Sequence, residues 1–280
     1  MARIPFGINR LDGIINGGAP PGSVVLLSGE AGAGSREFMY TSAVMHGLAR
    51  AGHDLFDLHY GDLDPGAELP ESVHYLSFTQ SESQLKDEIT MAMDPEVAEP
   101  ALDEIEFQSL AHQYFHVSPV PRDWYAQETP NIKNLRKRHE EREGLLTALG
   151  AELSRRASGN LVVIDSLSNL VGAADDDNLS LSDVTHLVNG LQRAAYDWNG
   201  LLLLHVNHAA VDERIYGQLV DACSGTMRFQ WETGGSTRAR TLVVQQFRGV
   251  LPQIEAENIV QFETELGEAG FDISDVRKIR

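Results

Sequence analysis

Short runs of consecutive apolar residues, separated by segments with helical spacing, most constrain how this chain can fold. The clearest runs are Val24–Leu27, Leu161–Ile164 and Leu201–Leu204. Strands that are covered on both faces of a parallel sheet have such runs, whereas half-exposed strands alternate apolar and polar residues. Strands that alternate with helices therefore predict an α/β fold with a mostly parallel central sheet flanked by helices. The sequence has no clean linker, so we expect a single domain.

The remaining elements follow from the same patterns. Further strands are predicted at Val73–Phe78, Tyr114–Val117, Thr226–Trp231 and Ala239–Phe247, and the run at Leu201 is predicted to extend to Val206. Helices are predicted at Glu37–Ala51, Ser83–Met93, Asn134–Ala157 and Ser182–Trp198. Residues 53–72 are rich in Asp, Gly and Pro and predict a surface loop. Residues 94–110 and 118–133 lack a regular pattern.

Composition excludes several classes of protein. With 280 residues and 42% hydrophobic residues, the chain can bury a full-sized core without covalent staples. Cys223 is the single cysteine, so no internal disulfide can form, which is typical of cytosolic proteins. Residues Met1–Gly7 contain no apolar segment of the signal-peptide kind, and the apolar runs are too short to span a bilayer. We expect a cytoplasmic protein with no membrane span.

The charge is strongly acidic. Lys and Arg total 22 against 41 Asp and Glu, a formal net charge of −19, and four of the basic residues are lysine. This composition is typical of proteins that work in concentrated salt, where the Debye length shrinks to roughly 3 Å at 1 M. An ordinary acidic cytoplasmic protein is the alternative. Either way, the charge argues against a nucleic-acid-binding surface.

A glycine-rich segment, Ser28–Glu37, follows the first predicted strand and opens the first predicted helix. In such a position, glycines allow backbone N–H groups to turn inward, and the helix N-terminus adds positive potential for a phosphate. The phosphate-loop pattern is G-x-x-x-x-G-K-[ST], and Gly29 and Gly34 have the required spacing. The candidate phosphate-binding residues are Gly29, Glu30, Ala31, Gly32, Ala33, Gly34, Ser35 and Arg36.

Two positions depart from this pattern. Ser35 stands where the pattern has lysine, and Arg36 stands where it has Ser or Thr. The lysine normally reaches the outer phosphates, and the hydroxyl binds Mg²⁺. Arg36 is one residue too late, which on a helix is a rotation of about 100°, so we expect it not to point where the lysine would. A glycine-rich turn that binds no ligand is the alternative interpretation.

Neighbouring segments add a resemblance. Pro5–Ser23 leads directly into the loop, Asn160–Ser168 contains an apolar strand that ends in Asp165, and Gln246-Phe-Arg-Gly249 follows a late strand. In this order they resemble the KaiC/RadA-like branch of the RecA superfamily of P-loop ATPases, over about residues 4–250. The resemblance implies a RecA-like fold, with residues 251–280 as a C-terminal extension packing on the core. It also implies a ring or filament with nucleotide between subunits.

The resemblance assigns further residues and shows where this chain departs from the family. Asp165 would orient Mg²⁺ through water, Asn207 would sense the phosphate, and Arg248 would approach the nucleotide of the next subunit. Thr79 and Gln80 stand where the family has acidic residues that prepare the attacking water, and neither can act as a general base. The lysine of the late phrase is replaced as well, by Gln246.

Several other patterns have simpler interpretations. Asn207 and His208 form either a phosphate sensor or a capped strand end, and His205 is interpreted as a core histidine. The basic cluster Lys133–Arg142 is followed at once by acids, which favours a solvated helix face. Asp175–Asn178 is interpreted as an acidic surface loop. No zinc-like His/Cys spacing is present, and no G-x-S-x-G elbow supports Ser-His-Asp catalysis.

Three hypotheses follow. The first is a non-hydrolysing regulatory or scaffold protein, a pseudo-ATPase of haloarchaeal type. It would bind ATP weakly, and Mg²⁺ is not expected to contribute much to this binding. It would assemble with itself or with related RecA-like proteins in a regulatory pathway. The second is an active ATPase in which Arg36 or a partner's cation replaces the lysine. The third is a DNA-associated recombinase paralogue, which the charge of −19 disfavours.

Overall fold

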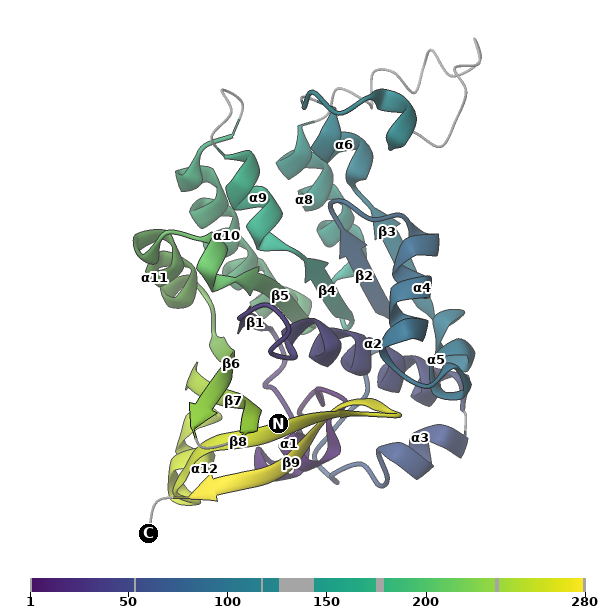
Figure 1. Cartoon of the computed structure of the whole chain (residues 1–280), viewed down its shortest axis with the longest axis vertical. Coiled ribbons are helices and arrows are strands. Elements are labelled where there is room, and N and C mark those ends of the chain that lie inside the picture. Colours follow the sequence, from purple (N-terminus) through teal and green to yellow (C-terminus); the bar gives the residue numbers. More distant parts are fainter. Residues whose placement is uncertain are drawn as a thin grey trace.

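A single large sheet organises the molecule. The computed structural model of the chain describes residues 2–52, 54–116, 118–125, 144–174, 179–234 and 237–278. Within these residues, nine strands form one sheet in the order β3-β2-β4-β5-β1-β6-β7-β8-β9 (Figure 1). The strands from β3 to β6 pair in parallel, and β7, β8 and β9 continue the sheet in antiparallel pairing. The strands are β1 (Ser23–Gly29), β2 (Val73–Ser77), β3 (Ile105–Ser109), β4 (Leu161–Asp165), β5 (Leu201–Asn207), β6 (Gly225–Gly234), β7 (Thr237–Phe247), β8 (Ile259–Gly267) and β9 (Gly270–Lys278).

Helices cover both faces of this sheet. The described α-helices are α1 (Asn9–Ile14), α2 (Ser35–Ala51), α3 (Asp54–His59), α4 (Glu82–Ala92), α5 (Pro95–Leu102), α6 (Ala111–Phe115), α8 (Leu145–Arg156), α9 (Leu167–Ala173), α10 (Leu181–Trp198), α11 (Glu213–Ala222) and α12 (Leu251–Ala256). Val25 and Leu27 of β1 point into the core beneath α2, while Val24 and Leu26 point into the core beneath α10. This alternation explains why the strand is apolar at every position.

Most elements predicted from the sequence are confirmed, including the mostly parallel sheet. One predicted strand is wrong. Tyr114 lies in helix α6, which ends at Phe115, and the third strand is Ile105–Ser109. This strand lies at the edge of the sheet, where only Ile105 is fully buried. Its apolar residues therefore alternate with polar ones such as Glu106, and the strand lacks the apolar run that identifies the central strands.

Other segments are more regular than predicted. Residues 94–110 contain helix α5 and strand β3, and residues 53–72 contain the short helix α3. In the range predicted as a long charged helix, α8 covers Leu145–Arg156. The basic cluster Lys133–Arg142 lies within residues 126–143, which are outside the described residues. The acidic segment 175–178 is outside them as well.

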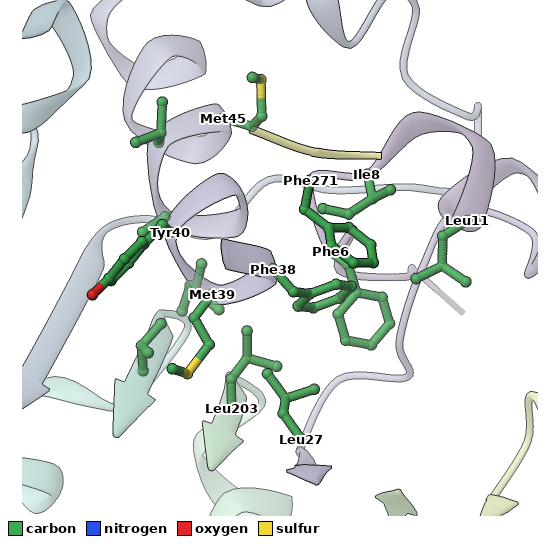
Figure 2. Close-up of a cluster of buried hydrophobic side chains, with 14 of the residues drawn as sticks. Phe6, Ile8, Leu11, Leu27, Phe38, Met39, Tyr40, Met45, Leu203 and Phe271 are labelled. Atoms are coloured by element: carbon green, nitrogen blue, oxygen red, sulfur yellow. The ribbon is translucent and has the colours of Figure 1, made fainter. Parts of the chain in front are cut away.

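The C-terminal residues contribute to the core. Strands β8 and β9 form a hairpin that runs beside α2 (Figure 1). Phe271 of β9 is 2% exposed, and its ring centroid lies 5.3 Å from that of Phe38 in α2 (Figure 2). The Phe271 ring centroid also lies 5.7 Å from that of Phe229 in β6. The Phe271 N–H also donates to Thr41 Oγ1 at 2.8 Å. The hairpin therefore fixes the first turns of α2 from outside the parallel part of the sheet.

Within the described ranges, none of the helices combines the length and the apolar character needed to cross a membrane.

Candidate functional site

The candidate site lies where the carboxyl ends of four parallel strands meet the N-terminus of α2. The loop Glu30–Gly34 connects β1 to this helix, and Asp165 ends β4. In register, Gly29 lies beside Asn207 of β5, and Ser77 of β2 lies beside Asp165. Ligands of open α/β sheets bind at this edge. The structure thus brings together the predicted loop residues, Asp165 and Asn207.

Two carbonyls of the loop backbone accept hydrogen bonds from side chains of β6 and β7. The indole Nε1–H of Trp231 donates to Ala31 O at 3.1 Å, and Arg240 Nε donates to Gly32 O at 3.0 Å. Gly32 and Gly34 have φ values of +74° and +105°, which favour glycine. Among the described residues, no acceptor is recorded for the N–H groups of Ala31, Gly32 or Gly34. These N–H groups and the start of α2, which no side chain caps, fit an anion.

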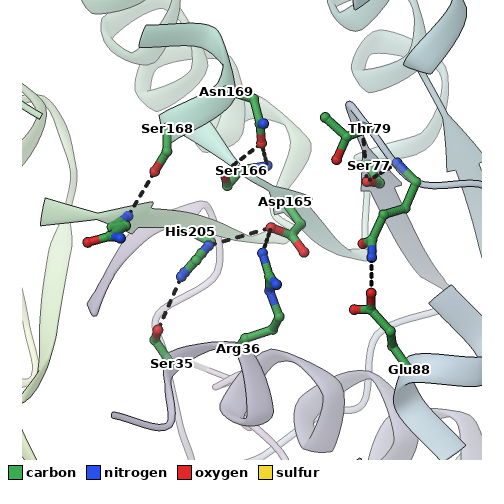
Figure 3. Close-up of polar contacts among 12 residues, drawn as sticks. Ser35, Arg36, Ser77, Thr79, Glu88, Asp165, Ser166, Ser168, Asn169 and His205 are labelled. Carbon is green, nitrogen blue, oxygen red and sulfur yellow. Dashed lines mark hydrogen bonds and ion pairs between the residues drawn. The ribbon is translucent and has the colours of Figure 1, made fainter. Parts of the chain in front are cut away.

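Ser35, at the position of the usual lysine, points into the sheet. Its hydroxyl lies 3.1 Å from His205 Nε2, and Ser35 and His205 are both buried (Figure 3). A Cβ added at Gly29 would lie 2.0 Å from Ser35 Oγ, so only glycine permits this close packing. The lysine position therefore supplies a short hydroxyl to the interior and no cation to the loop.

Arg36 points toward the carboxylate that ends β4. One guanidinium nitrogen lies 3.3 Å from Asp165 Oδ1 (Figure 3). Asp165 is 3% exposed, whereas the Arg36 side chain is 46% exposed. Burial opposes the charge of Asp165, but His205 and the charge of Arg36 outweigh it and hold the pKa of Asp165 below its usual value. Burial likewise opposes the charge of Arg36, and the nearby Asp165 raises its pKa. The two groups form a stable ion pair.

Two tyrosines complete the surroundings of this pair. Tyr75 Oη donates to Asp165 Oδ2 at 3.2 Å, and Tyr40 Oη donates to Glu88 Oε2 at 2.7 Å. Burial raises the pKa of both phenols, so each remains an O–H donor at neutral pH. Gln80 Nε2 donates to the other oxygen of Glu88. The helix α4 thus brings a carboxylate, Glu88, near the end of β2.

The positions that the resemblance assigns to acidic residues lie at this strand end. The N–H groups of Thr79 and Gln80 lie 3.4 and 3.1 Å from Ser77 Oγ, which accepts from both (Figure 3). Neither side chain is acidic, so a base at this edge would have to come from another element, and Glu88 is the carboxylate that lies nearby.

Asn207 and Arg248 have different surroundings. Asn207 Oδ1 accepts from the Ala209 N–H at 3.1 Å and so caps the short 3₁₀ turn His208–Ala210, the capped strand end considered above. Arg248 is exposed, and its N–H donates to Ser224 O just before β6 begins. This is the amino end of the parallel strands, opposite the loop. Arg248 therefore does not reach the loop of its own chain.

The side chains of Ser35, His205 and Asp165 follow one another as in a hydrolase triad. Ser35 Oγ lies 3.1 Å from His205 Nε2, and His205 Nδ1 lies 3.5 Å from Asp165 Oδ1. A triad needs an unpaired carboxylate to stabilise the imidazolium and an accessible nucleophile. Here Arg36 pairs with the same carboxylate oxygen, and Ser35 is 4% exposed against Gly29. These polar contacts connect the first turn of α2 to strands β4 and β5.

Sequence reasoning missed His205, Tyr75, Tyr40 and Glu88. His205 was interpreted as a core residue, yet it lies two positions before Asn207 on the same strand, and residues two apart share a face. Tyr40 lies four positions after Arg36 on α2, which places both on one face of the helix. Glu88 carries no comparable signal, because only the packing of α4 against α2, α5 and β3 brings it near.

A loop of this kind implies a bound polyphosphate and a metal ion, and the residues present fit the polyphosphate but not the metal. The free N–H groups and the uncapped helix start fit an anionic phosphate chain. Mg²⁺ requires oxygen ligands in octahedral geometry, but Arg36 stands at the hydroxyl position and has no acceptor atom. Asp165, the remaining candidate ligand, already contacts Arg36, His205 and Tyr75. The residues present do not fit Mg²⁺.

Comparison with known proteins supports the fold. No family model and no curated protein matches the sequence. Among solved structures, the chain resembles the flagellar accessory protein FlaH from Methanocaldococcus jannaschii, with a TM-score of 0.59 and 13% identity over 100% of both chains. It also resembles a KaiC-like protein from the hyperthermophilic archaeon Pyrococcus horikoshii, with a TM-score of 0.56 and 15% identity over 98% of this chain and 99% of that one. These similarities confirm the predicted single-domain RecA-like fold.

Proposed function

We propose that this chain is a RecA-like nucleotide-binding protein that does not turn over ATP, and that it acts as a regulatory or scaffold component. The loop Glu30–Gly34 offers backbone N–H groups to a phosphate chain, as P-loops do. The fold shared with FlaH, a flagellar accessory protein by its title, is compatible with an accessory role. The proposal therefore separates binding, which the loop supports, from hydrolysis, which the side chains do not support.

The observation that carries the proposal is the burial of Ser35. At the position from which a lysine normally reaches the outer phosphates, the side chain turns inward to His205 at 3.1 Å. The positions for a general base hold Thr79 and Gln80, which cannot accept a proton from water near neutral pH. These positions therefore lack the cation that stabilises the transition-state charge and the group that positions the attacking water, on which phosphoryl transfer mainly depends.

Calorimetric titration of the full chain with ATP tests the binding part. We expect weak binding that Gly34→Asp abolishes, because position 34 has a φ of +105° that favours glycine and an added Cβ would lie 3.1 Å from the Phe271 ring, so the loop would have to shift. Gly52→Asp is the matched control, since Gly52 ends the same helix with a φ of +62° and open space around it. Absence of binding at millimolar ATP in the wild type would refute the proposal.

A second candidate, an ATPase with an atypical loop, is favoured by Glu88. Its carboxylate lies near Arg36, held by Tyr40 and Gln80, and could accept a proton from an attacking water. This candidate requires steady turnover that Glu88→Gln reduces at least a hundredfold. Turnover no higher than that of a denatured control, measured at saturating ATP across a range of protein concentrations, selects the first proposal.

The expected partners are further copies of this chain or related RecA-like proteins. Arg248 is exposed at the end of the sheet opposite its own loop, which is where a residue that serves a neighbouring subunit could lie. Light scattering with and without ATP tests assembly, and Arg248→Ala should weaken any nucleotide-dependent assembly. A role on DNA would instead require affinity for DNA that falls steeply with salt.

A further inference from the structure

We propose that Arg36 takes the place of the metal ion, so that the site binds its phosphate chain without Mg²⁺ and discriminates against the Mg²⁺ complex. This inference rests on the proposed function and specifies which form of the nucleotide is bound. The residues present do not fit Mg²⁺, and Arg36 is the cation that contacts Asp165 beside the loop.

Arg36 occupies the position from which a phosphate loop normally binds Mg²⁺. In a phosphate loop, the residue after the lysine position and the aspartate at the end of a neighbouring strand hold Mg²⁺ between them. In this chain those two residues are Arg36 and Asp165, and they contact each other directly at 3.3 Å. Both are fixed by regular structure, because Arg36 lies in the first turn of α2 and Asp165 ends β4.

The carboxylate already has three partners in the protein. Oδ1 of Asp165 faces Arg36 and lies 3.5 Å from His205 Nδ1, and Oδ2 accepts from Tyr75 at 3.2 Å. Asp165 is 3% exposed, so an ion could reach it only by displacing Arg36. A buried carboxylate needs a positive charge beside it. A bound metal ion can supply that charge, and in this chain Arg36 supplies it.

Arg36 retains donors for a ligand. A guanidinium carries five N–H donors in a planar fork, and one of its terminal nitrogens, Nη2, contacts Asp165. Its side chain is 46% exposed and starts two residues after Gly34, beside a loop in which the N–H groups of Ala31, Gly32 and Gly34 have no acceptor among the described residues. It can therefore bind a phosphate oxygen while it remains paired with Asp165, as arginine does in bidentate phosphate sites.

The charges of the site predict its selectivity. A lysine and a Mg²⁺ ion would together supply three positive charges, whereas Arg36 supplies one. A nucleotide that arrives as its Mg²⁺ complex brings a second cation next to the guanidinium, and the two repel each other. We therefore expect metal-free ATP and metal-free tripolyphosphate to bind at least tenfold more tightly than their Mg²⁺ complexes.

The test is calorimetric titration of the full chain with ATP and with sodium tripolyphosphate, once in EDTA and once in excess Mg²⁺. The wild type should bind both ligands in EDTA and lose affinity when Mg²⁺ is added. Arg36→Thr, which restores the hydroxyl, should lose at least tenfold in EDTA and gain affinity with Mg²⁺. Arg36→Lys keeps the charge without the fork and should retain metal-free binding with lower affinity.

Arg50→Thr is the matched control, because Arg50 lies in the last turn of the same helix and pairs with Glu104. It should leave both titrations unchanged. Wild-type binding that requires Mg²⁺ overturns this inference and leaves the proposed function intact. Absence of wild-type binding in both buffers overturns the proposed function together with the inference. If Arg36→Thr does not fold, the wild-type Mg²⁺ dependence and Arg36→Lys decide.

Discussion

Gly29→Ala tests the contact between β1 and α2 on which the geometry of the site depends. A Cβ at position 29 would lie 2.0 Å from Ser35 Oγ and 2.6 Å from Ser35 Cβ. Rotation of the hydroxyl relieves only the first contact, so the start of α2 must move by about 1 Å. Overpacking of this kind costs about 1–3 kcal/mol, and loss of the Ser35–His205 contact adds about 1 kcal/mol. We expect a total loss of about 2–4 kcal/mol.

Thermal unfolding followed by circular dichroism measures this loss, which corresponds to a decrease in Tm of roughly 5–15 °C. Gly190→Ala is the control, because Gly190 is exposed in the middle of α10 with no neighbour within 4 Å, and alanine there should stabilise by about 1 kcal/mol. The double variant Gly29→Ala/Ser35→Gly removes both clashing atoms and should recover at least half of the loss. A single variant that melts like the wild type would refute the reasoning.

Four further predictions follow from the described residues. Burial lowers the pKa of His46 to about 4, so this site takes up a proton on unfolding between pH 4 and 6.5, and its contribution to the free energy of unfolding falls by about 3 kcal/mol as pH drops through this window; the difference in free energy of unfolding between His46→Leu and wild type, measured by urea denaturation, should change by that amount across the window. Phe271→Ala should cost about 3–5 kcal/mol in the same assay, because Phe271 is 2% exposed, whereas Val260→Ala at a 46% exposed site should cost under about 1 kcal/mol. Ser35 should resist fluorophosphonate labelling, read by mass spectrometry, since Arg36 occupies the carboxylate that a triad would need. With a net charge of −19, Tm should rise between about 0.1 and 1 M KCl as screening shortens the Debye length; a constant or falling Tm would contradict the high-salt interpretation of the composition.

The central strands could be predicted because their environment determines their composition. Strands β1, β4 and β5 are covered on both faces, so nearly every position must be apolar. The edge strand β3 has no such requirement, and its alternating sequence Ile-Glu-Phe-Gln-Ser resembles many exposed segments. The β8–β9 hairpin was not predicted as strands for the same reason, since its outer positions are polar and exposed.

The candidate site was predictable only where a linear motif contributes. The loop from Gly29 to Arg36 and the strand end at Asp165 follow from local sequence, and the parallel register places them at one edge. His205 could have been placed there by the two-residue period from Asn207. Glu88 could not, because its approach to Gln80 depends on how α4 packs against α2, α5 and β3, which no local pattern indicates.

The substitutions at positions 35 and 36 make sense only as a pair. A lysine at 35 would extend toward the phosphates, and serine instead lets the first turn of α2 pack on Gly29 and contact His205. Arg36 alone would compete with a metal for Asp165, but without the lysine it is the one cation within the loop segment Gly29–Arg36. In the metal-free site that we propose, Arg36 stands in for the divalent ion, and the affinity for phosphate would come mainly from backbone N–H groups. Such a site would hold a ligand without the charge needed to stabilise the transition state of phosphoryl transfer, and this is the reason for our proposal of binding without turnover.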